Sequence, residues 1–426
     1  MYVVMVAKVS GLMNQNDRSI VVFTGLSHAA VHTFELSIPI LVVIWLVEFP
    51  VTTATIGLVV SVGYALFGIG ALPGGVLADR YGSRVLILGC LFGMAVSFLA
   101  LSFAGGVWTI CGTLVLWGIA ASVYHPSGLS LISKGVEDRG TAFAYHGMAG
   151  NIGIAFGPLV TALLLIVFDW RVVSRLLVIP AFVTVAYGLR TEFDERAAVS
   201  VDGGTTQSSP KSIATLLADS QSLFTAGFTL AMVIVMMNGL FYRATLTFLP
   251  EVLGGFLPPF AEQGLLFDPD SPLAEKFDLA SYLYAGLLMV GIVGQYVAGK
   301  ASDTVEPTRL LPIVFGALAI VAIGFTTVSQ IGIGPLLAVS GLLGFLLFAL
   351  QPLYQSIIAE QSLPGSRGLS YGYTYLLSFG IGASGAALAG YLLSVATTEH
   401  TFLLLACIPA FGAVFSVLLR RWSTNS

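Results

Sequence analysis

The chain contains many continuous apolar runs of roughly twenty residues or more, the length an α-helix needs to cross a bilayer. Lipid offers no hydrogen-bonding partner, so only helices and closed β-barrels satisfy the backbone there. Barrel strands alternate in hydropathy over segments of about ten residues, whereas these runs are apolar throughout. With 56% hydrophobic and 9% charged residues, the chain could not hide its apolar surface in one soluble core. We therefore expect an all-α membrane protein.

Charged residues and Gly/Pro-rich breaks divide the apolar sequence into twelve predicted spans. A polar stretch at 190–221 has the composition of a linker and separates six spans from six. We predict an N-terminal segment at 1–19, a six-helix bundle at 20–189, the linker at 190–221, a second six-helix bundle at 222–421 and a tail at 422–426. The spans are expected at 20–47, 52–78, 85–104, 107–133, 141–168, 171–189, 222–249, 279–301, 308–328, 332–359, 368–394 and 399–421.

The distribution of positive charge predicts the orientation. An even number of spans puts both termini and the linker on one side, and 14 of the 18 lysines and arginines fall on that side. Only Arg171 and Lys276 fall on the opposite side. Because positively charged loops stay in the cytoplasm, we expect both termini and the linker to be cytoplasmic in a multi-pass protein of the plasma membrane.

The two halves of the sequence resemble one another. Three patterns recur in the same order: Gly75 to Asp79 with Gly299 to Asp303, Gly118 to His125-Pro126 with Gly344 to Gln351-Pro352, and Arg139-Gly140 to Gly157 with Arg367-Gly368 to Gly385. Such repetition favours a duplicated six-helix unit. The predicted fold is therefore twelve transmembrane helices in two pseudo-symmetric six-helix bundles.

The first predicted span holds the densest group of polar residues. His28, His32 and Glu35 are spaced i, i+4 and i+7, which places them on one helical face. A carboxylate and two imidazoles within reach of one another can exchange protons near neutral pH. We interpret Glu35, helped by His32 and His28, as a proton-coupling site. The alternative is a hydrogen-bonded cluster that only fixes this helix against its neighbours.

Arg243 lies inside the seventh predicted span, with Asn238 five residues earlier. A lipid-exposed arginine is costly, so Arg243 should face the interior. It could pair with Glu35, since the two residues belong to the first helices of the two halves. It could instead hold an anionic substrate through its planar guanidinium group. Both interpretations place Arg243 and Asn238 at a central cavity.

Further polar and aromatic residues inside spans are candidates to line that cavity. Packing, hydrogen bonding to a proline-freed carbonyl and an aromatic belt at the membrane interface explain some of them equally well. The candidates are Tyr124, His125, His146, Asn151, Gln351, Gln355 and Tyr373, with Tyr371 and Tyr375 beside the last. The three cysteines lie within apolar runs and show no metal or disulfide spacing. We expect no metal, no cofactor and no nucleic-acid partner.

The turn between the second and third predicted spans carries the most specific motif. Its sequence, Gly75-Val-Leu-Ala-Asp79-Arg80-Tyr-Gly82-Ser-Arg84, puts three charges between two apolar runs, and Gly82 suits a tight turn with positive φ. The pattern G-x-L-A-D-R-x-G-x-R resembles the signature of the major facilitator superfamily at every defined position. The second copy, at Asp303, lacks the Arg and Gly that follow Asp79.

The resemblance implies a role for this turn. In the superfamily the aspartate docks against the start of the eleventh helix, where Arg367 lies in this chain. We therefore expect Gly75, Asp79, Arg80, Gly82 and Arg84, with Asp303 and Arg367, to form a conformational latch rather than a binding site.

Within the superfamily, the runs Gly118-Ile-Ala-Ala-Ser122-Val-Tyr-His125-Pro126 and Asn151-Ile-Gly153 resemble the fosmidomycin-resistance type of drug exporter, as does Ser27-His28. Gly153-x-x-x-Gly157-Pro158 is similar to a motif of drug–proton antiporters. Close helix packing would favour the same small residues.

These resemblances imply a secondary active transporter that moves a small organic molecule by alternating access, with proton-coupled export expected. The alternatives are a proton-coupled symporter of a metabolite or organic anion, and a membrane sensor that keeps a transporter fold. No nucleophile set or phosphate-binding loop of suitable spacing indicates an enzyme. The expected partners are the substrate, protons and the lipid bilayer, and we expect the protein to work as a monomer.

Overall fold

The computed structural model describes residues 13–199, 220–257, 278–362 and 367–425, and throughout these ranges the secondary structure is helical, without strands. The side chains of residues 367, 368, 424 and 425 lie outside the description. Eleven described helical segments are long and apolar enough to cross a membrane. The pair α3 and α4, bent by 45°, makes a twelfth if it counts as one span. The all-α membrane fold predicted from the sequence is confirmed.

The helices follow the predicted order of spans. The first half contains α2 (Gln15–Glu48), α3 (Thr53–Ile69), α4 (Ala71–Tyr81), α5 (Ser83–Leu101), α6 (Val107–Ala121), α7 (Tyr124–Gly135), α8 (Arg139–Leu165), α9 (Trp170–Leu176) and α10 (Val178–Arg190). The second half contains α12 (Ala226–Phe256), α14 (Leu279–Ser302), α15 (Pro307–Ser329), α16 (Ile333–Gln361), α17 (Arg367–Tyr375), the π-helix η1 (Leu376–Ile381), α18 (Ser384–Val395), α19 (Thr398–Leu405) and α20 (Cys407–Asn425).

Several predicted spans are broken or displaced, for local reasons. The fourth is divided into α6 and α7, and Pro126 sits in the first turn of α7, where its missing N–H leaves no helical bond unmade. The first span starts at Gln15, inside the segment that we expected to precede it. Asn14 caps this helix, because its side chain accepts a hydrogen bond from the backbone N–H of Asp17 at 2.8 Å.

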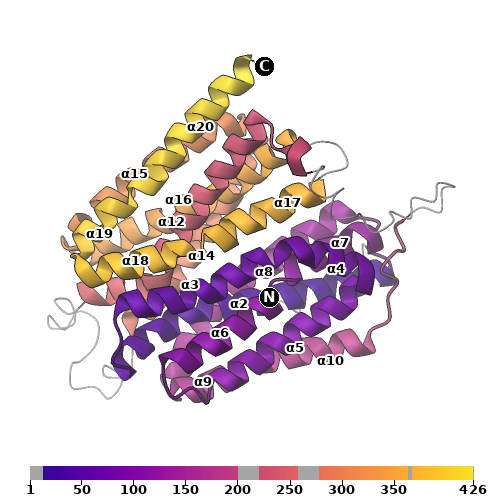
Figure 1. Ribbon diagram of the computed structural model, residues 1–426, viewed down its shortest axis with the longest axis horizontal. Helices are drawn as coiled ribbons and strands as arrows, with labels where there is room; N and C mark the ends of the chain where they lie inside the picture. The colour runs from indigo at the N-terminus through magenta and orange to yellow at the C-terminus, as the bar shows by residue number, and fades with distance from the viewer. Residues whose placement is uncertain (1–12, 200–219, 258–277, 363–366, 426) are drawn as a thin grey trace.

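The two halves form separate groups of helices that meet along their lengths (Figure 1). The junction includes α3 against η1 and α18, α2 against α12, and α8 against α14. Glycine allows the closest approach, since a Cβ on Gly68 would lie 1.9 Å from the backbone nitrogen of Gly380. The hydroxyl of Ser61 also donates a hydrogen bond to the carbonyl of Ala383 at 2.5 Å.

The sequence repeats correspond to equivalent contacts in the two halves. A Cβ on Gly75 would lie 3.9 Å from Pro126, and one on Gly299 would lie 3.8 Å from Pro352. A Cβ on Gly118 would meet a carbonyl oxygen of α3 at 2.2 Å, whereas one on Gly344 would meet a carbonyl oxygen of α14 at 2.4 Å. The recurring residues therefore make the same packing contacts twice, which supports duplication.

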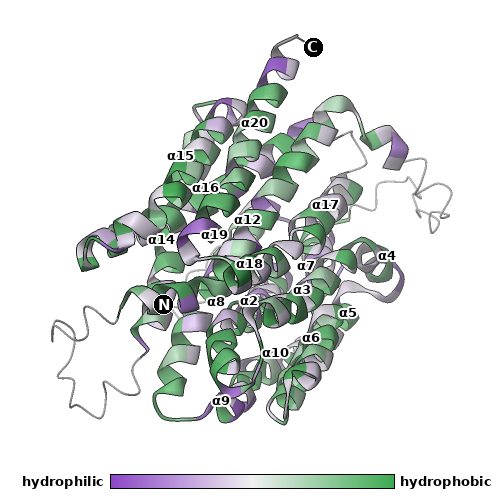
Figure 2. Cartoon of the chain, turned by 60° about the vertical axis from the view of Figure 1, so that its left-hand side comes forward, coloured by the Kyte–Doolittle hydropathy of each residue, from purple (hydrophilic) through white to green (hydrophobic). Residues whose placement is uncertain are grey.

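Hydrophobic residues make up most of each long helix (Figure 2). On α15, Ile313, Ile320 and Ile323 are each more than half exposed. Exposed isoleucines along one face of a helix fit contact with lipid rather than water.

Candidate functional site

Glu35 of α2 and Arg243 of α12 form an ion pair between the two halves. The guanidinium Nη2 donates a hydrogen bond to Glu35 Oε1, and the two side chains are only 1% and 3% exposed. Burying two charges costs desolvation energy, which the attraction between them offsets. Removing one partner would therefore leave the other charge buried and uncompensated. The structure thus adopts the first of the two arrangements considered for Arg243, direct pairing with Glu35.

Aromatic rings surround the arginine. Its Cζ lies 3.8 Å from the ring centroid of Tyr64 in α3, and 5.2 Å from that of Phe379 in η1. Rings at these distances stabilise a cation through their negative faces. The Tyr64 hydroxyl also donates to the backbone carbonyl of Glu35 at 3.2 Å. Sequence reasoning did not select Tyr64 or Phe379, because aromatic residues in apolar runs look like ordinary core.

Two buried polar atoms of α12, Arg243 Nε and Asn238 Oδ1, lack a partner within the described part of the chain. Buried polar groups normally find a hydrogen-bond partner. Arg243 Nε belongs to the ion pair itself, so this donor is one that a polar ligand could engage.

A line of hydrogen bonds runs from Glu35 through two histidines of α2. His32 Nδ1 lies 2.5 Å from Glu35 Oε2, and His32 Nε2 lies 3.0 Å from His28 Nε2. His28 Nδ1 lies 2.8 Å from the carbonyl oxygen of His146 in α8. The predicted i, i+4, i+7 face is therefore a connected chain of titratable groups.

Either ring nitrogen of a histidine can donate or accept a hydrogen bond, depending on the tautomer. This line of contacts can therefore pass a proton between Glu35, His32 and His28.

Neighbouring helices hold the His28 ring in place. It stacks on His146 with a centroid distance of 4.0 Å, and Gly150 makes room, since a Cβ there would lie 2.4 Å from the His28 ring. The hydroxyl of Tyr124 lies 3.2 Å from His146 Nε2 and donates to the carbonyl of Thr24 at 2.6 Å. The predicted residues Tyr124 and His146 thus belong to the same cluster as His28.

His125 approaches this cluster from α7. Its ring centroid lies 5.3 Å from that of His28 and 5.6 Å from that of His32. On its other side it contacts Tyr375 of α17 at 4.7 Å, so it also faces the opposite half. Four histidines from three helices therefore lie together beside the ion pair.

A second polar contact joins the halves through amide side chains. Asn151 of α8 donates to Gln295 of α14 at 2.8 Å, and Gln295 donates to Gln351 of α16 at 3.1 Å. Sequence reasoning found Asn151 and Gln351 but missed Gln295. The signal was present, because Gln295 is also a polar residue within an apolar run.

Two predicted cavity residues lie elsewhere. Gln355 is exposed on α16, one turn beyond Gln351. Tyr373 packs against Phe224 with a ring distance of 5.0 Å, whereas Tyr375 reaches the histidines. Helical phase explains the difference, since residues two apart on a helix point in nearly opposite directions.

The charged turn that carries the family signature has the predicted backbone. Gly82 has φ 88°, the one φ among the described residues that lies in the range favouring glycine. Arg84 donates to the carbonyl oxygens of Gly188 and Thr191 at the end of α10. Asp79 pairs with Lys134 of α7 at 2.6 Å, a partner in its own half that the sequence did not suggest.

The remaining residues of the predicted latch lie apart from Asp79 or outside the description. Arg80 stacks over its neighbour Tyr81 at 5.2 Å. Asp303 pairs with Lys300 at 3.4 Å within its own turn. Arg367 begins α17, but its side chain lies outside the described residues. Contact between Asp79 and Arg367 therefore stays a prediction, although α4 does pack against α17.

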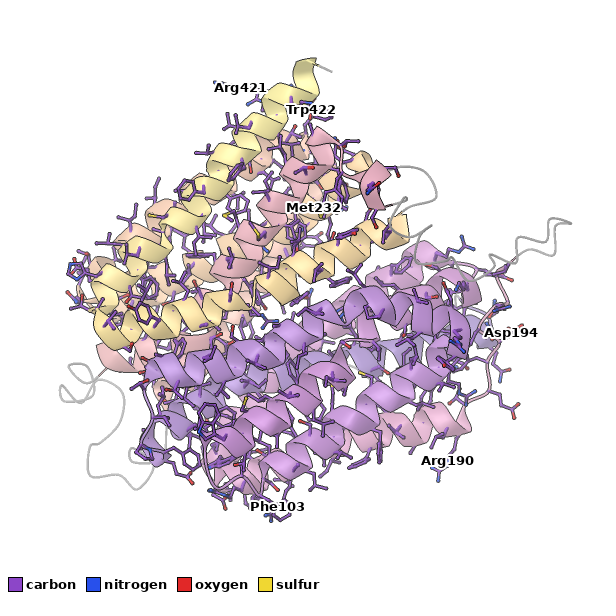
Figure 3. The ribbon with its side chains drawn as sticks, viewed as in Figure 1. Phe103, Arg190, Asp194, Met232, Arg421 and Trp422 are labelled. Atoms are coloured by element: carbon purple, nitrogen blue, oxygen red, sulfur yellow. The ribbon has the colours of Figure 1, made fainter. Side chains whose placement is uncertain are left out.

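The first part of the predicted linker binds to the N-terminal half. The carboxylate of Glu195 accepts hydrogen bonds from the backbone N–H groups of Ser83 and Arg84 at 2.8 and 3.3 Å. Asp194 exchanges backbone hydrogen bonds with the side chain of Asn16. Figure 3 shows Asp194 and Arg190 at the same end of this half. Residues 191–199 are therefore an attached segment, while 200–219 lie outside the described residues.

A family model described as Major Facilitator Superfamily matches residues 23–387. The chain belongs to this superfamily. It is 23% identical over 346 residues to an uncharacterized MFS-type transporter, YfnC, from Bacillus subtilis, covering 77% of this chain and 76% of that one. It is 27% identical over 178 residues to a Na(+), Li(+), K(+)/H(+) antiporter from Planococcus maritimus, covering 40% of each chain.

Solved structures show the same fold. A point mutant of the nucleoside transporter NupG has a TM-score of 0.75 and 13% sequence identity, and the match covers 95% of this chain and 99% of that one. The superfamily prediction is thus confirmed, and the chain is a multi-pass membrane transporter for a small molecule.

Proposed function

We propose that this transporter is proton-coupled and exports a small organic molecule in exchange for protons across the plasma membrane. The observation that carries the proposal is the Glu35–Arg243 ion pair, which joins the halves and continues into the line of hydrogen bonds through His32 and His28. A carboxylate bonded to both an arginine and a histidine can exchange a proton as its distance from the arginine changes.

Alternating access supplies that change. If the halves rock about the central site, α2 and α12 shift relative to one another and the ion pair loosens. The unpaired Glu35 then holds its proton more strongly, whereas the re-formed pair favours release. Arg243, freed from Glu35, offers its donors to the substrate. The state of the Glu35–Arg243 pair thus links binding of the substrate to binding of the proton, as antiport requires.

Two further observations favour export by antiport. The Gly153-x-x-x-Gly157-Pro158 motif, which resembles that of drug–proton antiporters, packs directly on α2, since a Cβ on Gly153 would lie 2.2 Å from the carbonyl oxygen of Ala29. One relative is described as a cation/proton antiporter. The likeness to the fosmidomycin-resistance type of exporter points the same way.

A proton-coupled symporter of an organic anion is the second candidate. The unsatisfied Arg243 Nε favours it, because a guanidinium group with a free donor can bind a substrate carboxylate or phosphate. Such a substrate would replace Glu35 as the partner of Arg243.

One experiment tests both candidates. Purified protein is reconstituted into vesicles that contain a pH-sensitive dye, and a substrate found by thermal-shift screening is added outside. Antiport makes the lumen alkaline as substrate enters and protons leave, whereas symport makes it acidic. Uptake without any change in lumenal pH would refute proton coupling.

The matched variants are Glu35→Gln and Glu48→Gln, which alter the same residue type on the same helix. We expect Glu35→Gln to abolish the pH change. Glu48 pairs with Arg171 at the end of α2 and is one-third exposed, so Glu48→Gln should retain the pH change. Equal loss in both variants would contradict the coupling role of Glu35.

A further inference from the structure

Four of the five histidines of the chain lie in one buried group, and a proton pathway through Glu35 uses only two of them. His28, His32 and His125 each offer a ring nitrogen, and these nitrogens lie within 4.8 Å of one another. The fifth histidine, His400, is exposed on α19, where its Nδ1 lies 2.7 Å from the hydroxyl of Thr397.

The outer nitrogens of two of these rings are already bonded. His28 Nδ1 faces the carbonyl oxygen of His146, and His32 Nδ1 faces the carboxylate of Glu35. A metal-binding histidine typically donates its second N–H to a carbonyl or a carboxylate, which fixes its tautomer and orientation. In both rings this leaves Nε2 as the inward atom, and the two Nε2 atoms lie 3.0 Å apart.

The nature of the ligands selects the type of ion. Imidazole nitrogens suit zinc, copper, nickel and iron, whereas magnesium and calcium need oxygen ligands. Zinc binds histidine nitrogen at about 2.0–2.1 Å, so two tetrahedral ligands lie about 3.4 Å apart. The observed separations require only small ring movements to reach that geometry. Three protein ligands also leave the fourth position open.

The surroundings hold the three rings ready for such an ion. The His28 ring contacts the rings of His146 and Tyr124, at 4.0 and 5.4 Å. His125 is held between Phe67 and Tyr375, at 5.5 and 4.7 Å. Preorganised ligands lose little conformational entropy when they bind.

We propose that His28, His32 and His125 form a binding site for a divalent transition-metal ion such as Zn²⁺, located where the His28–His32 hydrogen bond now lies. The ion would link α2 to α7 inside the N-terminal half. This site does not depend on the coupling mechanism proposed above, because it can be measured by binding alone.

The test is direct metal binding by the full-length protein in detergent, with any affinity tag removed. Zn²⁺ binding is measured by titration calorimetry, the retained metal is counted after dialysis, and Co²⁺ absorption reports the coordination geometry. We expect one ion per chain. His28→Gln, His32→Gln and His125→Gln should each weaken Zn²⁺ binding by about tenfold or more, and His400→Gln should not change it.

A second variant separates ligand loss from misfolding. His125→Cys keeps a zinc ligand at the same position, so it should retain Zn²⁺ and add a sulfur-to-metal band to the Co²⁺ spectrum. No retained Zn²⁺ in the wild-type protein would overturn the site. Binding that survives all three glutamine variants, or that is lost equally in His400→Gln, would overturn it as well.

Discussion

The two halves of this transporter share one packing plan but differ in chemistry. In the N-terminal half, α2, α7 and α8 bring together Glu35 and four histidines. The C-terminal half contributes Arg243, a single buried charge among its described residues, within a setting of aromatic rings and amides. Duplication thus preserved the glycine and proline contacts that build the bundles, whereas the ionisable groups diverged. In the proposed mechanism, the N-terminal half holds the exchangeable proton and Arg243 of the C-terminal half supplies the fixed charge.

The same contrast appears at the charged turns. In the N-terminal half, Asp79, Arg84 and Glu195 link the turn to α7, α10 and the attached linker segment. In the C-terminal half, the described ion pairs of Asp303 and Glu306 lie within their own turn, at i, i+3 spacing. A turn that is hydrogen-bonded to other helices is sensitive to their movement. A turn whose ion pairs lie within itself is not.

The largest effect is expected when the fixed charge is removed. Arg243→Ala leaves Glu35 buried without its cation, which should destabilise the protein by about 3–5 kcal/mol and abolish transport. The thermal unfolding midpoint in detergent measures the first effect. The double variant Glu35→Gln with Arg243→Gln should regain much of the lost stability. If Arg243→Ala proves as stable as wild type, Arg243 does not supply the charge that stabilises buried Glu35, and the proposed roles of the two halves are wrong.

The next effect concerns the proton on the N-terminal side. His32 is faced by Glu35, His28 and His125, and exchange of one proton on substrate binding changes Kd by about tenfold per pH unit. His32→Gln should flatten that dependence. Gln351→Ala, which removes a polar side chain of the C-terminal half, should lower affinity without altering the slope. Equal slopes in wild type and His32→Gln would contradict the assignment.

A smaller effect should distinguish the two turns. Asp79→Ala breaks the contact with Lys134 and should slow turnover by about fivefold while substrate affinity stays nearly unchanged, because exposed ion pairs contribute little energy. Asp303→Ala should leave turnover close to wild type. Initial transport rates over a range of substrate concentrations separate the two quantities. A large loss of affinity in Asp79→Ala would refute the latch.

The smallest effect concerns the linker segment. Glu195→Ala removes the acceptor for two backbone N–H groups at the start of α5 and should cost about 1 kcal/mol of stability. Limited proteolysis should then cut between residues 191 and 199 faster. Glu306→Ala provides the matched change in the other half, where no such cap exists among the described contacts, and its digestion pattern should match that of wild type.

The fold could be predicted from the sequence, because long apolar runs in lipid form helices. The turn at Gly82 could be predicted because its backbone conformation needs glycine. The helix break at Gly70 could not be predicted, because it depends on a neighbouring helix: a Cβ on Gly70 would lie 2.3 Å from the hydroxyl of Ser122. Such contacts exist only once the helices have packed.

The site was readable in part. His28, His32 and Glu35 share a helix, so their spacing placed them together. Tyr64 and Gln295 reach the centre from other helices, and their positions depend on how each helix is rotated. Tyr373 and Tyr375 show the same limit: both were candidates, and the rotation of α17 decides that Tyr375 reaches the histidines while Tyr373 packs against Phe224.

The π-helical turn η1 has a consequence for motion. Between Leu376 and Ile381 the backbone makes wider turns, as in the hydrogen bond from the Gly382 N–H to the carbonyl of Leu377 at 2.9 Å. Such a turn holds one residue more than a regular helix would, equivalent to about 100° of winding. Tightening or shifting it would twist α17 about its own axis while α18 keeps its contacts with α3. Such a shift would add the rotation of one helix to the rocking of two rigid halves.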